Sequence, residues 1–148
     1  MKASWIYPFI IVGGVLQAVG APMNGQLFAS FHNKWLASSV SFLLVTFFFV
    51  TMFLIFPRPL PTMQQVIQMP WWAPVGGLVG AVQVYAGLTL VKRVGAGPFM
   101  GLTVTAALVA SLLIDHFGWF NIPPHSLNFW RVGGALLMIA GIGLVTRF

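Results

Sequence analysis

Hydrophobic residues occur along this chain in five long runs, separated by short stretches rich in charge, proline or glycine. The runs cover residues of about 5–27, 35–56, 72–91, 97–116 and 127–145. Each is close to the roughly 20 apolar residues that a helix needs to cross the hydrocarbon core of a membrane. Because backbone polar groups must be satisfied within each span, the runs predict helices. We therefore predict an all-α integral membrane protein, with residues 1–148 forming one transmembrane domain.

Composition supports the membrane assignment. Charged residues make up 5% of the chain, whereas a soluble domain carries about 25%. The net charge of +6 comes from basic residues scattered between the apolar runs, where membrane proteins keep Lys and Arg, so we expect no nucleic-acid binding. The absence of cysteine excludes disulfides and thiolate metal sites. The first run is too long for a signal peptide and contains Gln17 and Asn24.

The basic residues give little preference for one orientation. Five spans place the termini on opposite sides of the membrane, here called side A (N-terminal) and side B. Side A holds Lys2, Arg58 and Arg131, and side B holds Lys34, Lys92, Arg93 and Arg147. An excess of one basic residue specifies the orientation weakly. Any preference that results would place side B in the cytoplasm. Tryptophans gather on side A, with Trp35 alone on side B, and interfacial anchoring explains them.

Two of the runs carry amide side chains within a stripe of glycines at helical spacing. The stripes are Gly13, Gln17, Gly20 and Asn24 in the first run, and Gly76, Gly80, Gln83 and Gly87 in the third. On one interpretation the glutamine side chains form hydrogen bonds between closely packed helices. On the other, the stripes line a cavity near the membrane midplane, where transporters bind substrates. The second interpretation makes Gln17, Asn24, Gln83 and Tyr85 the candidate substrate-binding residues.

The second run is apolar nearly all round its helix. Its Ser and Thr hydroxyls can bond to backbone carbonyls one turn back, which removes the cost of placing them in a membrane. We therefore expect this helix to face mostly lipid.

Asp115 is the one acidic residue of the chain. It lies roughly 27 Å along the fourth helix, near the edge of the hydrocarbon, and Gly118 is typical of a residue that ends a helix. A carboxylate in a last turn opposes the helix dipole and should attract a cation. Arg131 is the best candidate, ahead of His116 and His125. Asp115 is then either a structural partner of Arg131 or of loop amides, or a proton- or substrate-coupling group.

Three motifs resemble the YdcZ-like family of the drug/metabolite transporter superfamily: "QAVGAPMNGQL", "WWAPVGGLVGAVQV" and "SLLIDHFG". The resemblance covers nearly the whole chain. It implies a bacterial inner-membrane protein of five helices that functions as half of a ten-helix assembly with inverted halves, formed by antiparallel pairs. One departure is the Gly-Gln pair that the family often carries before its "SLLID" motif. Here those positions are Ala106 and Ala107, so a ligand contact by that glutamine is lost.

The resemblance also bears on the substrate. Related small multidrug antiporters rely on a carboxylate deep in the first span, and this chain has Gln17 and Asn24 there with no acid. A neutral, zwitterionic or amphipathic substrate bound by amides and aromatic rings therefore suits these residues better than a hydrophobic cation exchanged for protons.

Together these features predict a small-molecule secondary transporter or facilitator of the inner membrane, working as an antiparallel homodimer by alternating access. The alternatives are a passive dual-topology channel and an accessory membrane subunit. We find no nucleophile beside a base, and the three histidines lack the spacing of a metal pair. We therefore expect no enzyme activity, no metal and no cofactor. The expected partners are the substrate, membrane lipid and a second copy of the chain.

Overall fold

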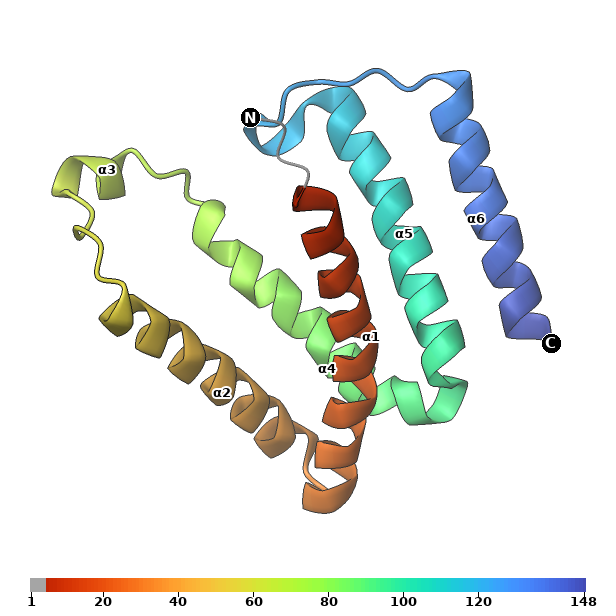
Figure 1. Cartoon of the computed structure of the whole chain (residues 1–148), viewed down its shortest axis with the longest axis horizontal. Coiled ribbons are helices and arrows are strands. Elements are labelled where there is room, and N and C mark those ends of the chain that lie inside the picture. The colour runs from red at the N-terminus through yellow and green to blue at the C-terminus, as the bar shows by residue number, and fades with distance from the viewer. Residues whose placement is uncertain (1–4) are drawn as a thin grey trace. The chain divides into compact units, whose positions relative to one another are not determined.

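The computed structural model describes residues 5–148, and Lys2, assigned above to side A, lies outside them. Helices dominate this range, which contains no strand, and five are long and apolar enough to cross a membrane. These are α1 (Ile6–Phe31), α2 (Lys34–Ile55), η1 (Ala73–Val75) continuing into α4 (Gly76–Val94), α5 (Ala96–Phe117) and α6 (Phe129–Arg147). The short helices α3 (Met63–Ile67) and η2 (Trp119–Asn121) lie in the connections (Figure 1). The all-helical prediction is confirmed for residues 5–148.

Large apolar side chains are widely exposed on these helices. Phe47 and Leu54 on α2, for example, are each 71% exposed. In water, patches of this kind would drive association or aggregation, whereas in a bilayer they face hydrocarbon. The exposed surface thus agrees with the membrane assignment, and the orientation of α2 towards lipid stays a prediction.

The helix ends follow local signals. α1 passes through Pro22 and continues beyond Leu27, the end expected from the hydrophobic run. It ends where His32 adopts a left-handed φ of 53°. Asn33 then caps α2, its side-chain oxygen accepting hydrogen bonds from two backbone N–H groups at 3.1 Å, as N-cap residues do. Two residues therefore suffice to reverse the chain between α1 and α2.

The chain divides into two compact units, the first ending at Arg93 and the second beginning at Val94. In the first unit α2 runs back from the end of α1, and α4 returns in the direction opposite to α2 (Figure 1). The connection between α2 and α4 is long and includes α3, whose start is fixed by a capping box between Thr62 and Gln65. The second unit is the hairpin of α5 and α6, joined through η2.

Close packing in the first unit is concentrated near the end of α1. Gly25 and Val91 are buried there, and a Cβ atom on Gly25 would lie 2.7 Å from Cγ1 of Val91. The side chain of Lys92 also donates a hydrogen bond to Oε1 of Gln26 at 2.7 Å. This glycine and this hydrogen bond therefore define the contact between α1 and α4. By contrast, Cβ atoms added at the stripe glycines would meet no atom within 4 Å at Gly13, Gly20, Gly76 and Gly80.

Candidate functional site

A cavity of about 500 Å³ opens between α2 and α4 in the first unit. We call it the α2–α4 pocket. On α2, Trp35, Ser38 and Phe42 share one helix face at i, i+3 and i+7, and on α4 Ala81 and Tyr85 lie one turn apart. The full lining is Trp35, Ser38, Ser39, Phe42, Ala81, Val82 and Tyr85. Most of this lining is apolar, with aromatic rings at one end.

The two rings at that end form a stack that carries a positive charge. The centroids of Trp35 and Tyr85 are 5.2 Å apart and their planes differ by 28°. The ammonium group of Lys34 lies 5.4 Å from the Trp35 centroid and 5.7 Å from the Tyr85 centroid, within the range of cation–π attraction. Among residues 5–148, the structure records no ion pair for Lys34. The pocket therefore has a mostly apolar lining, and the charge of Lys34, which is not a lining residue, lies beside its Trp35–Tyr85 end.

Ser38 is one of the lining residues, but its polar atom is shielded from solvent. This Oγ is buried and has no hydrogen-bond partner in the described part of the chain. Two hydroxyls of the same helix do bond to carbonyls one turn back: Ser39 donates to Trp35 at 2.9 Å, and Thr51 to Phe47 at 2.8 Å. Ser38 differs from them because its buried hydroxyl lacks this bond.

The four predicted substrate-binding residues have different surroundings. Asn24 accepts a hydrogen bond from the Ser41 hydroxyl at 3.1 Å and so links α1 to α2. Gln17 and Gln83 are exposed, and no hydrogen bond is recorded for either side chain within residues 5–148. Tyr85 lines the α2–α4 pocket. No recorded hydrogen bond or ring contact joins any two of the four, and their role as substrate ligands stays a prediction.

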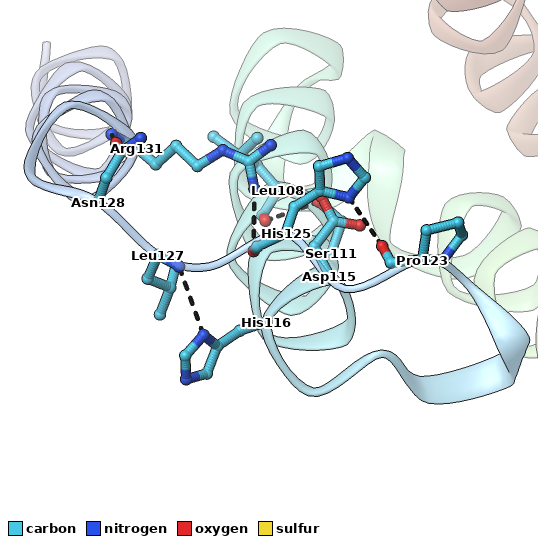
Figure 2. A network of polar contacts seen from close by, with 9 residues as sticks. All are labelled: Leu108, Ser111, Asp115, His116, Pro123, His125, Leu127, Asn128 and Arg131. Carbon is cyan, nitrogen blue, oxygen red and sulfur yellow. Dashed lines mark hydrogen bonds and ion pairs between the residues drawn. The ribbon is translucent and has the colours of Figure 1, made fainter.

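In the second unit, Asp115 lies at the centre of a polar network that closes the α5–α6 hairpin (Figure 2). The guanidinium of Arg131 is 3.5 Å from the Asp115 carboxylate and 3.4 Å from the carbonyl oxygen of His125. Both side chains of the pair are about one-third exposed, at 33% and 34%. The backbone N–H of His125 donates to the backbone carbonyl of Asp115 at 2.7 Å. The expected pairing of Asp115 with Arg131 is confirmed, while its role is not tested by this geometry.

Three further groups fix the same connection. Gly118 ends α5 with a left-handed φ of 65°, as expected. His116 accepts a hydrogen bond through Nδ1 from the backbone N–H of Leu127 at 3.3 Å, and Asn128 caps α6 by accepting from the N–H of Arg131 at 2.9 Å. Within residues 5–148, no three histidine or acidic side chains gather as a metal site would require. These hydrogen bonds join the end of α5, the loop and the start of α6.

Sequence reasoning did not identify the α2–α4 pocket. The sequence indicates interfacial anchoring for Trp35 and no ligand-binding role for Lys34 or Ser38. The i, i+3, i+7 spacing of Trp35, Ser38 and Phe42 could have marked one face of α2, but the long apolar run obscured it. What joins this face to Tyr85 is the register of α2 against α4, which spacing within one helix does not contain.

Comparison with known proteins gives one family and one curated relative. A family model described as "Putative inner membrane exporter, YdcZ" matches residues 5–144, which includes part or all of each of the five long helices. The "Inner membrane protein YdcZ" of Escherichia coli (strain K12) is 32% identical over 77 residues, 52% of this chain and 51% of the relative. The match thus spans about half the length of that relative. No solved structure matches the chain.

Proposed function

Because the chain belongs to the YdcZ family of inner-membrane proteins, we propose that it is a secondary transporter or facilitator for a small molecule. It is a multi-pass protein of the inner membrane, and the family description as an exporter favours transport over catalysis. In the proposed working form, two antiparallel copies make a ten-helix assembly. This assembly exposes its binding site alternately to the two sides of the membrane.

The observation that carries the proposal is that two amide side chains at the middle of their spans are exposed without a recorded hydrogen bond. Gln17 and Gln83 lie near the middle of their spans, are exposed, and have no recorded hydrogen bond within residues 5–148. An amide facing hydrocarbon without a partner costs several kcal/mol. Their faces of α1 and α4 are therefore better suited to a polar passage than to lipid, and the midplane is where transporter sites lie.

The distribution of charge limits the kind of substrate. The single carboxylate, Asp115, is at the end of α5 and is paired with Arg131. No acidic residue occurs in α1, where a buried carboxylate would bind a hydrophobic cation. A neutral, zwitterionic or amphipathic substrate therefore fits the proposal better than a multidrug cation.

Flux measurements on purified, reconstituted protein test the proposal. A labelled panel of amino acids, aryl carboxylates, aryl sulfonates and hydrophobic amines would be offered to proteoliposomes. Gln17→Ala and Gln83→Ala should each lower the flux of a transported compound by about tenfold, the effect of losing one ligand contact of about 1.4 kcal/mol. The matched control is Gln64→Ala, an exposed amide in the connecting helix α3, which should leave flux unchanged.

Three results would contradict the proposal. Loss of thermal stability in the Gln17 and Gln83 variants, with flux per folded molecule unchanged, would make the amides structural links between helices. Flux that does not saturate and depends weakly on temperature would indicate a passive channel. Co-purification of a stoichiometric second protein, with no flux by the chain alone, would indicate an accessory subunit.

A further inference from the structure

We infer that the α2–α4 pocket binds amphipathic anions, that is, molecules with an apolar body and a single anionic head. The inference rests on the proposed function: the pocket, whose lining includes neither Gln17 nor Gln83, would be an additional site for the substrate class of that transporter. It is carried by three observations: the apolar lining, the ammonium of Lys34 beside the Trp35 and Tyr85 rings, and the buried, unpartnered hydroxyl of Ser38.

The lining fits an apolar body of limited size. A cavity of about 500 Å³ falls within the roughly 300–1,000 Å³ of typical small-molecule sites. From Trp35 to Phe42 the pocket follows α2 for about 10 Å, at 1.5 Å per residue. Trp35 lies at the start of this helix, so the pocket extends from the membrane interface into the hydrocarbon. A molecule with one polar end and one apolar end matches that gradient.

The charge at the interfacial end favours an anion. Lys34 is the first residue of α2, where its positive charge adds to the positive end of the helix dipole. Asp115, the one carboxylate among the side chains, is in the other unit and paired with Arg131. Lys34 is left to interact with the Trp35 and Tyr85 rings. An anionic head would compensate this charge, whereas a cationic ligand would have to displace Lys34 from the same rings and be repelled by it.

Ser38 supplies a second hydrogen-bonding group on the same face. It follows Lys34 by four residues, which places both side chains on one side of α2. Its Oγ is buried without a partner among residues 5–148, and an unsatisfied buried hydroxyl is costly. The acceptor oxygens of a carboxylate, sulfonate or phosphate can take hydrogen bonds from the ammonium of Lys34. The Ser38 hydroxyl is shielded from solvent in the ligand-free structure, so it would bond to the anion only after the neighbouring side chains move.

Two sources could supply such a molecule. One is a free solute, such as an aryl carboxylate or sulfonate entering from the aqueous side. The other is an anionic membrane lipid, whose head group would lie at Lys34 and whose chain would follow the apolar lining. The chemistry at the pocket is the same, so the experiment must separate the sources.

Equilibrium binding to the purified full-length protein in a neutral detergent tests the inference. The probe is the fluorescent anion 1-anilinonaphthalene-8-sulfonate, and its neutral counterpart is N-phenyl-1-naphthylamine, which has the same rings without the sulfonate. Lys34→Gln should weaken binding of the anion by about tenfold, the effect of losing one charge-assisted contact. Binding of the neutral probe should not change. Ser38→Ala should weaken anion binding by a smaller factor.

The controls separate a specific contact from general surface charge. Arg93→Gln removes one positive charge from the same unit, at an exposed position with no recorded contact to the Trp35 or Tyr85 ring among the described residues, and should leave anion binding unchanged. Lys34→Arg keeps the charge and should retain binding. Competition by short-chain phosphatidylglycerol alone would assign the pocket to lipid, and competition by naphthalene-1-sulfonate alone to solutes. Either result, or competition by both, supports an amphipathic-anion site.

Two results would overturn the inference: an equal loss of anion binding in Lys34→Gln and Arg93→Gln, or tighter binding of tetraphenylphosphonium than of tetraphenylborate. A separate measurement of naphthalene-1-sulfonate flux into proteoliposomes distinguishes failure of this inference from failure of the proposed function. Anion binding at Lys34 without any flux would refute transport and leave the site. Saturable flux of other solutes without anion binding would refute the site and leave the transporter.

Discussion

At the scale of single residues, hydroxyl groups show how far local rules extend. The sequence predicts that Ser and Thr in the second span bond to carbonyls one turn back, and Ser39 and Thr51 do so. Ser38, next to Ser39 in the chain, does not, and its Oγ is left buried. Spacing within the helix is the same for Ser38 and Ser39, so no pattern within one helix predicts this difference.

Replacement of Ser38 by alanine should stabilise the protein in the absence of ligand. The change removes a buried hydroxyl that has no partner, a group that costs about 1–3 kcal/mol, and alanine is the better helix former. We expect the free energy of unfolding to rise by about 1 kcal/mol, measured by thermal unfolding in detergent. Ser39→Ala is the matched control and should change stability by about 0.5 kcal/mol or less. A loss of stability in Ser38→Ala would mean that this hydroxyl is bonded in the folded protein.

The glycine positions show a second limit of residue-level reasoning. Helical spacing groups Gly13 and Gly20 with Gln17 on one face of α1, but a spacing rule does not say what meets that face. In the structure the close approach of α4 is at Gly25, against Val91, outside the predicted stripe. Tyr85, a predicted substrate-binding residue, lines the α2–α4 pocket, and its role in binding stays a prediction. The sequence predicts its stacking partner Trp35 only as a membrane anchor. Contacts of this kind depend on the register between helices.

At the scale of elements, the α5–α6 hairpin was the most predictable part of the site. The helix dipole argument anticipates a cation for Asp115, and Arg131 provides it. The glycine signal correctly ends α5 at Gly118. The route of the loop was not predictable, because Phe120 and Asn121 adopt positive φ angles of 59° and 60°, which non-glycine residues rarely do. That route brings the N–H of the loop histidine to the carbonyl of Asp115.

Neutralising Asp115 should have a small effect on stability. The carboxylate and Arg131 are 3.5 Å apart and about one-third exposed, and pairs of this kind contribute about 1 kcal/mol or less. The backbone hydrogen bond from His125 to Asp115 and the Asn128 cap remain in Asp115→Asn. We therefore expect a loss of about 0.5–1 kcal/mol in thermal unfolding, with little further loss on adding Arg131→Gln.

Asn128→Ala provides the contrast for this test, because losing an N-cap costs about 1 kcal/mol whatever the charge of its neighbours. A loss of several kcal/mol in Asp115→Asn would show that the charge pair, rather than the backbone, holds the hairpin. A stable Asp115→Asn protein whose flux no longer depends on pH would show that Asp115 couples transport to protons.

At the scale of the whole molecule, charge distribution governs orientation and assembly. By the order of the spans, three basic residues fall on side A and four on side B. Because the two sides differ by a single basic residue, the preference of Lys and Arg for the cytoplasmic side favours neither orientation strongly. Insertion in both orientations, followed by antiparallel pairing, is therefore the arrangement that we propose for the assembly.

Labelling of single cysteines in intact cells tests this arrangement. The chain has no cysteine of its own, so Leu60→Cys and Phe148→Cys each introduce a single thiol, at positions that are 76% and 96% exposed. These positions belong to side A and side B respectively. Antiparallel pairs predict that each thiol is modified in part by a membrane-impermeant maleimide added outside, and in full once the cells are permeabilised. Complete external labelling at one position and none at the other would establish a single orientation and exclude the antiparallel pair.

The two-residue turn between α1 and α2 restrains these helices more tightly than the long connection restrains α4. Three Cα–Cα links separate Phe31 from Lys34, and they can extend to roughly 10 Å at most, so these two helix ends cannot separate widely. The connection from α2 to η1 and α4 is much longer, so it limits the distance between these helix ends far less. α4 is therefore the less constrained wall of the α2–α4 pocket. Widening the pocket would have to separate the Trp35 and Tyr85 rings that stack across it, while the Gly25–Val91 packing and the hydrogen bond from Lys92 to Gln26 keep the end of α4 at α1.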